Sequence, residues 1–103
     1  MAADSVREFF AGLESRVDPA KTAGMTNSYV FDVEGAGQWT VRVADGAVSV
    51  TEGAEDADVT ITGEAETFER IVQGEQSATT AYMTGKIKIK GDMGAAMKLQ
   101  KLF

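Results

Sequence analysis

The chain has 103 residues, of which 44% are hydrophobic and 25% charged, and this size and composition are typical of one globular domain. It contains no cysteine and no histidine, which excludes disulfides, serine or cysteine nucleophiles activated by histidine, and the usual zinc sites. A net charge of −6 argues against a nucleic-acid partner, and no run of about 20 apolar residues predicts a membrane span, so we expect a cytoplasmic protein with no integral membrane segment.

The first predicted element is an amphipathic helix over residues 5–17. Ser5 and Glu8 have the spacing of a capping box, which places the start of the helix at Ser5. The apolar residues that follow recur with the 3.6-residue period of one helix face: Val6, Phe9, Phe10, Leu13 and Val17. We expect this face to cover a sheet, and the helix to end or turn at Pro19.

Between residues 27 and 61 the apolar period changes to two, which predicts four strands. The glycine-rich residues 35–37 and the pair at residues 45–46 have the composition of hairpin turns, so the first three strands should form an antiparallel meander. The acidic residues 52–58 predict a solvated loop before the fourth strand. Each strand is apolar on one face and largely polar on the other, with Val30 as the main exception.

From residue 64 to residue 85 the pattern is helical again. The first of two short helices carries three apolar residues on one face: Phe68, Ile71 and Val72. Gly74 ends this helix, and Ser77 is placed to cap the second one. The fifth strand is KIKIK, residues 86–90. About 24 residues separate strands four and five, which is long enough for a right-handed crossover that would make the two strands parallel.

The closing helix begins near Asp92 and is unusually apolar. Its small and apolar residues gather on one wide arc, and Met93 and Met97 form a second stripe beside it. This arc is about twice as wide as the roughly 100° that a helix needs to pack on a sheet. Neighbouring helices, a second subunit or an apolar ligand could cover the excess, and methionine suits a site that adapts to varied shapes.

No combination of residues predicts catalysis. The carboxylates lie in turns, in caps and in residues 52–58, where surface charge is the expected role and the spacing of a calcium loop is missing. The turn at residues 35–37 precedes a strand rather than a helix, which is the wrong context for a phosphate-binding loop. We therefore expect no catalytic residue, no metal and no cofactor.

The lysines of KIKIK are the one concentration of positive charge in the sequence. Lys86, Lys88 and Lys90 alternate with two isoleucines, so the lysines share one face of the strand. Contact with an anionic lipid surface, or with the phosphates of coenzyme A, is one interpretation. The favoured interpretation is a solvated face on an edge strand, where lysines discourage pairing with another strand.

Together these elements predict an α+β fold for residues 1–103, as a single domain. It is a two-layer sandwich in which a five-stranded mixed sheet has one face covered by helices. Three strings of this sequence, with the order of its elements, resemble the sterol carrier protein type two family of lipid-binding domains: GAGQWTVRVADGAVSV, ADVTITGEAETFERIVQGE and AYMTGKIKIKGDMGAAMKLQKL. The resemblance covers nearly the whole chain and implies a hydrophobic tunnel between the sheet and the helices. Members bind fatty acids, fatty acyl-CoA, sterols or other apolar molecules without metal or covalent chemistry.

The resemblance implies ligand contacts for apolar residues on the helices and the sheet. The matching positions are Phe10, Leu13, Trp39, Phe68, Ile71, Val72, Tyr82, Met83, Met93, Met97 and Leu102. For each of them, packing in the core is the alternative. We expect the group as a whole, rather than any one member, to line the tunnel.

The resulting expectation is non-enzymatic binding and carriage of a fatty acid, a fatty acyl-CoA or a sterol-like lipid. The alternative is a protein-interaction or enzyme-accessory module that uses the same groove for a partner or a dimer contact. Leu102 and Phe103 should form an exposed apolar rim, which a second subunit, as in a homodimer, or a bound lipid would cover. Transient contact with a membrane is compatible with both hypotheses.

Overall fold

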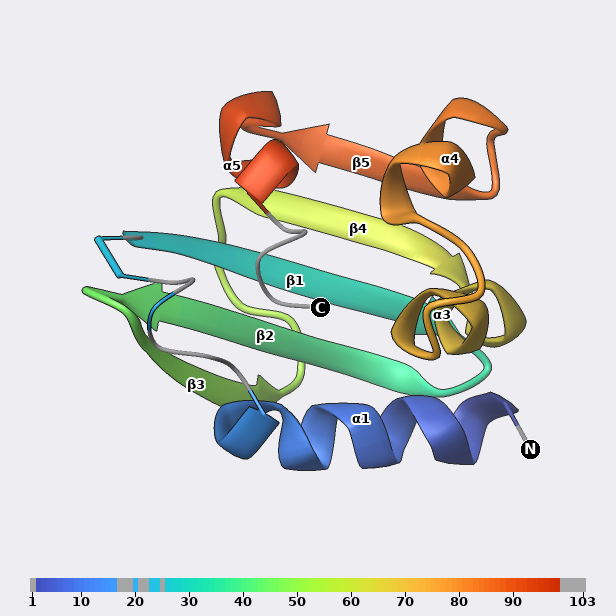
Figure 1. Cartoon of the computed structure of the whole chain (residues 1–103), viewed down its shortest axis with the longest axis horizontal. Coiled ribbons are helices and arrows are strands. Elements are labelled where there is room, and N and C mark those ends of the chain that lie inside the picture. Colours follow the sequence, from blue (N-terminus) through green and yellow to red (C-terminus); the bar gives the residue numbers. More distant parts are fainter. Residues whose placement is uncertain (1, 17–19, 21–22, 25, 99–103) are drawn as a thin grey trace.

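The computed structural model describes residues 2–16, 20, 23–24 and 26–98, and it confirms the predicted α+β class (Figure 1). The strands of its single sheet are β1 (Thr26–Glu34), β2 (Gly37–Ala44), β3 (Ala47–Glu52), β4 (Val59–Glu64) and β5 (Ile87–Gly91). The helices are α1 (Ala2–Arg16), α3 (Ala65–Val72), α4 (Ala78–Met83) and α5 (Met93–Met97). They lie against one face of the sheet and along its borders, with α1 beside β3 and with α4 and α5 beside β5.

Helix α1 begins at Ala2, so the prediction that it starts with a cap at Ser5 is wrong. Alanines are the strongest helix formers and Asp4 suits a first helical turn, which lets the helix extend to the N-terminal side of Ser5. The predicted apolar face is confirmed for four residues, which are all buried: Val6, Phe9, Phe10 and Leu13. Val17 lies outside the described residues.

The sheet has the strand order β3-β2-β1-β4-β5. Strands β1, β2 and β3 form the predicted antiparallel meander, and β1 pairs in parallel with β4 at the centre of the sheet. Strand β5 is antiparallel to β4, so the parallel arrangement considered for this pair is wrong. The connection consists of two helices of 8 and 6 residues that stay at one end of the sheet, and neither of them carries the chain back to the opposite end (Figure 1).

The core lies between the sheet and the helices. Alternate residues of the inner strands point toward it, and Tyr29, Phe31 and Val33 of β1 are each at most 1% exposed. From the helices, Phe10 and Phe68 meet these strand residues and are buried as well. One apolar face on the sheet and one on each long helix therefore account for a single core.

The other face of the sheet is crossed by the connection between β3 and β4. These strands lie on opposite sides of β2 and β1, so residues 53–58 must pass over both strands. The Thr40 hydroxyl donates to Gly53 O at 2.7 Å and accepts from the Glu55 N–H at 3.1 Å. Because the connection crosses this face of the sheet, Thr40 is only 1% exposed, and Val30, the exception to the predicted alternation of apolar and polar residues, is only 3% exposed.

Polar contacts hold the rest of this connection in place. Arg42 forms an ion pair with Glu55 at 3.0 Å. At the far end of the connection, the Asp58 carboxylate accepts a hydrogen bond from the Ser28 N–H at 3.1 Å. The Asp58 N–H donates to Ser28 O at the same distance. The acidic side chains are exposed, as the sequence predicts, while the backbone is fixed to the sheet.

The predicted helix starts at Ser77 and Asp92 and the predicted polarity of β5 are confirmed. The Ser77 hydroxyl accepts from the Thr80 N–H at 3.0 Å, and the Asp92 carboxylate accepts from the Gly94 and Ala95 N–H groups. Ile87 is buried, whereas the three lysines of the strand region are exposed. The helices in the described part of the chain are all too short or too polar to cross a bilayer.

We expect Thr40→Val to destabilise the fold by about 1–3 kcal/mol, because it leaves the Gly53 carbonyl and the Glu55 N–H without their partner under the connection. Urea unfolding measures this free energy. Thr51→Val is the matched control, since Thr51 pairs with Thr40 across the strands and is exposed. Equal effects of the two substitutions would show that Thr40 does not secure the connection.

Candidate functional site

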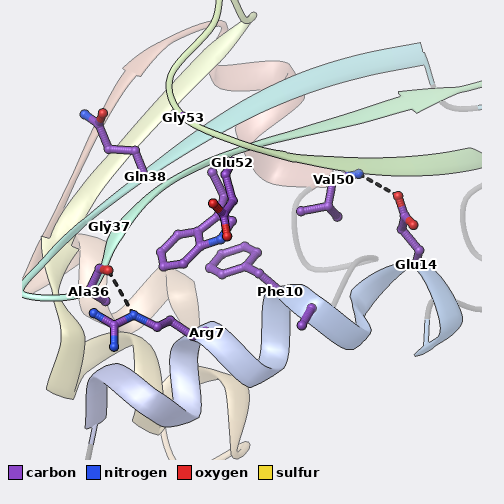
Figure 2. Close-up of a pocket in the computed structure, with 11 residues that line it drawn as sticks. Arg7, Phe10, Glu14, Ala36, Gly37, Gln38, Val50, Glu52 and Gly53 are labelled. Carbon is purple, nitrogen blue, oxygen red and sulfur yellow. Dashed lines mark hydrogen bonds between the residues drawn. The ribbon is translucent and has the colours of Figure 1, made fainter.

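A groove with a volume of about 660 Å³ lies between α1 and the strands β2 and β3 (Figure 2). Helix α1 forms one wall, and the β1–β2 turn, β2 and the end of β3 form the other. It is partly open to solvent. The lining residues are Arg7, Phe10, Ala11, Glu14, Ala36, Gly37, Gln38, Trp39, Val50, Glu52 and Gly53.

An aromatic pair forms the floor of the groove. The rings of Phe10 and Trp39 stack with centroids 4.7 Å apart and an angle of 15° between their planes. Trp39 is 6% exposed, so most of the indole is covered by this contact and by the groove wall. Gly37 has a φ of 144°, which favours glycine, and a Cβ at this position would lie 3.4 Å from Trp39 Cη2. The glycine therefore keeps the wall thin beside the indole.

Aromatic rings continue from this floor into the core. Phe10 is 5.0 Å from Phe31 of β1, and Phe31 is 6.2 Å from Phe68 of α3 in an edge-to-face arrangement. Such pairs contribute about 0.5–1.5 kcal/mol each beyond the burial of their area. The series joins the groove at the sheet border to the space beneath α3.

Two hydrogen bonds fix α1 at the two ends of the groove (Figure 2). Arg7 Nε donates to Ala36 O in the β1–β2 turn at 3.2 Å, and Glu14 Oε1 accepts from the Val50 N–H of β3 at 2.8 Å. Because β3 is an edge strand, Glu14 also occupies a backbone donor that would otherwise face solvent. The helix is thus held to the sheet at a set separation along the groove.

The groove is apolar in its floor and charged at its rim. Phe10, Ala11, Trp39 and Val50 supply the apolar surface, while Arg7, Glu14 and Glu52 supply charge at its border. Among the described residues, no three acidic side chains come together to hold a metal ion. The arrangement suits the burial of an apolar chain with a polar end near the rim.

The structure brings together two of the residues predicted to line a ligand site, Phe10 and Trp39, in the floor of the groove. Leu13, Phe68 and Ile71 are buried in the core behind this floor, and Val72 is partly buried against it. These side chains belong to one buried cluster, and a tunnel between the layers stays a prediction. Their contact with a ligand stays a prediction.

The remaining predicted site residues lie elsewhere. Tyr82 is 41% exposed, Met83 78% and Met93 45%, and all three are on the surface beside β5. The side chain of Met97 and the whole of Leu102 lie outside what the structure describes. Tyr82, Met83 and Met93 are therefore not among the residues that line the groove, and a role in ligand binding stays a prediction for all five residues.

Sequence reasoning missed most of the rim. Arg7, Glu14, Gln38 and Glu52 occupy polar positions of amphipathic elements, where exposure is the ordinary expectation. Val50 belongs to the predicted third strand, where the alternation alone does not indicate a groove. A usable signal was the spacing of Arg7 and Glu14 on the same side of the first helix, seven residues apart, which is two helical turns.

A second, smaller hollow of about 380 Å³ lies at the end of the sheet where β4 leads into α3. Its wall is polar and includes Glu34 and Glu64 together with Lys86 and Lys88. Opposite charges in one wall, without an apolar floor, do not match the lipid-binding expectation.

One buried hydrogen bond positions α5 on the sheet. The Tyr29 hydroxyl donates to Ala95 O at 2.6 Å. The pKa of Tyr29 is raised from 10.0 to about 12, mainly by burial of the phenol and also by the negative charges of Asp58 and Asp92. The neutral phenol is therefore the form that holds the helix.

The sequence matches the model of one known protein family. The model of the SCP-2 sterol transfer family matches residues 8–103. Among curated proteins, hydroxysteroid dehydrogenase-like protein 2 of Xenopus tropicalis is 35% identical over 101 residues, covering 94% of this chain and 24% of that protein. The chain thus spans about a quarter of the length of this relative.

Solved structures show the same fold both as nearly a whole chain and as a small part of one. Sterol carrier protein 2 like 2 of Aedes aegypti superposes with a TM-score of 0.73 at 26% identity, covering 96% of each chain. The inverting sec-alkylsulfatase Pisa1 from Pseudomonas sp. gives a TM-score of 0.77 at 25% identity, covering 91% of this chain and 15% of that one.

Stability should fall as the pH rises from about 10 to about 12, because in this window the unfolded chain loses the Tyr29 proton that the folded chain keeps. The loss should reach about 2–3 kcal/mol and should be absent in Tyr29→Phe. Urea unfolding across this pH range tests it, with Tyr82→Phe, an exposed tyrosine, as control. A slope in Tyr29→Phe as steep as that of the unchanged protein would contradict the assignment.

Proposed function

Because the chain belongs to the SCP-2 sterol transfer family, whose domains bind and transfer lipids, we propose that it is a non-enzymatic carrier of one apolar ligand. The ligand class is a fatty acid, a fatty acyl-CoA or a sterol-like lipid. The observation that carries the proposal is the groove of about 660 Å³ whose floor is the stacked Phe10–Trp39 pair. Its volume lies in the range typical of small-molecule sites, about 300–1,000 Å³.

The proposed path of the ligand chain runs from the groove into the core. A chain in the groove meets Phe10 and Trp39 first, and separation of this pair would give it access to Leu13, Phe68, Ile71 and Val72. These contacts are all apolar, so each Å² of chain surface that they cover contributes about 25 cal/mol to binding. The core would open as the ligand chain replaces the contacts that these core side chains make with one another.

The charges at the rim give the ligand a direction. Arg7 and Glu14 lie at opposite ends of the groove, roughly 10 Å apart along the helix axis. A carboxylate is attracted to the Arg7 end and repelled by Glu14 and Glu52. We therefore place the head group of a fatty acid beside Arg7 and its chain over the Phe10–Trp39 pair.

The second candidate is an accessory module in a larger protein. It is favoured by the relatives in which the matching region makes up 24% and 15% of the chain. In that case a protein segment, or a second copy of the chain, would occupy the groove. Native mass spectrometry distinguishes the two, because it reports a bound lipid and a dimer separately.

Freshly purified protein should carry a co-purified lipid in native mass spectra, and a fluorescent fatty acid should be displaced saturably by unlabelled fatty acid. Ala11→Gln places a polar side chain in the groove and should weaken binding about four- to fifteenfold, through the loss of contacts with one or two CH2 groups. Ser15→Gln is the matched control, an exposed position of α1 outside the groove. Absence of both lipid and displacement would exclude the carrier function.

Arg7→Gln should weaken the binding of a fatty acid about fivefold, because a partly exposed charge-assisted contact is lost, and should leave a neutral sterol unaffected. Isothermal titration with both ligands measures the difference. The control is Arg70→Gln, an exposed arginine on α3 outside the groove. Equal losses for the two ligands would place the head group elsewhere.

A further inference from the structure

The largest exposed apolar side chains of the described residues all flank one strand. Tyr82 and Met83 belong to α4, which precedes β5, and Met93 opens α5, which follows it. Figure 1 shows these helices at the two ends of β5, along the outer border of the sheet. Solvent exposure of a methionine or tyrosine is unremarkable singly, but three around one edge strand form a surface that favours an apolar contact.

The same border is the positive region of an acidic molecule. Lys86, Lys88 and Lys90 are exposed, and the ion pairs between described residues involve Arg7 and Arg42 instead. Residues 77–98 contain four lysines and one aspartate, whereas the other 81 residues contain six basic and fifteen acidic side chains. Residues 77–98 are therefore net positive in an acidic chain and also carry the exposed apolar side chains, although the acidic Glu34 and Glu64 lie near Lys86 and Lys88.

Strand β5 separates the two kinds of side chain. Its isoleucines face the layer of helices, so its lysines lie on the opposite face, next to Thr60 and Thr62 of β4. The helices that carry the exposed apolar residues lie on the isoleucine side. The β5 edge of the sheet thus presents apolar side chains on one side and lysine ammonium groups on the other.

A second copy of the chain is a poor occupant of this edge. Two β5 strands paired edge to edge would bring their lysine rows together, and like charges opposite one another destabilise a strand pair. An anionic bilayer offers what both flanks need, because its lipid head groups attract lysines and its acyl region accepts methionine and tyrosine side chains.

We propose that the β5 edge, defined by Tyr82, Met83, Lys86, Lys88, Lys90 and Met93, is the surface with which the protein docks on an anionic lipid bilayer. The proposal goes beyond ligand carriage, because it concerns the surface of the protein that contacts a donor or acceptor membrane. The charge asymmetry turns this edge toward a negative surface during approach. The groove beside α1 lies at the other border of the sheet and stays clear of the docked surface.

Flotation with vesicles of phosphatidylcholine containing about 30 mole per cent phosphatidylserine tests the proposal. Binding should require phosphatidylserine and should weaken as salt is added, because screening shortens the reach of the lysines. Lys90→Glu should lower the partition coefficient by at least about fivefold. Arg70→Glu makes the same change of charge on α3 and should have little effect. Met83→Ser, at a highly exposed position, should also weaken binding without a loss of folding.

Equal binding to vesicles of phosphatidylcholine alone, or equal effects of Lys90→Glu and Arg70→Glu, would overturn the proposal. So would dimerisation through β5 or capture of an acidic protein with no vesicle binding. The fatty-acid displacement assay is run in parallel on the same variants. Lys90→Glu should keep full displacement, so a failure of membrane docking is distinguishable from a failure of the carrier function.

Discussion

The parallel pairing of β1 with β4 is the constraint on which the architecture depends. A chain that has just completed an antiparallel meander can add a parallel strand beside β1 only by crossing β2 and β1. Here the crossing is made by residues 53–58 on the far face, held by Thr40 and Asp58. All four described helices are then left to the other face and its borders, where they enclose the apolar residues of the sheet.

This topology also gives the sheet two unlike edges. At β3, the carboxylate of Glu14 takes up the Val50 N–H, so the edge is closed by α1 and becomes the wall of the groove. At β5, the helices contribute only short segments near the strand ends, and lysines occupy the outer face. One edge faces a ligand-sized hollow and the other faces bulk solvent, although both belong to the same sheet.

Local features of the fold could be predicted from sequence because they depend on neighbouring residues. The alternation of Tyr29, Phe31 and Val33, and the caps at Ser77 and Asp92, are of this kind. The direction of β5 was not predictable from the length of its connection, since that length does not reveal that α3 and α4 stay at one end. The groove was missed for a related reason: Arg7 and Glu14 become its ends only when the β1–β2 turn and β3 are placed beside them.

The crossing of the far face also imposes an order on folding. Strands β1, β2 and β3 join neighbours along the chain through tight turns, whereas β1 meets the start of β4 across 30 positions of sequence. Contacts between residues so far apart in the sequence form late in folding, because the entropic cost of closing a long loop comes before the contacts that stabilise it. A chain emerging from the ribosome would therefore hold a three-stranded sheet with one border unsatisfied until residue 64 is free. During this period, the unpaired border of β1 is the part of the chain that is most accessible to chaperones and to wrong partners.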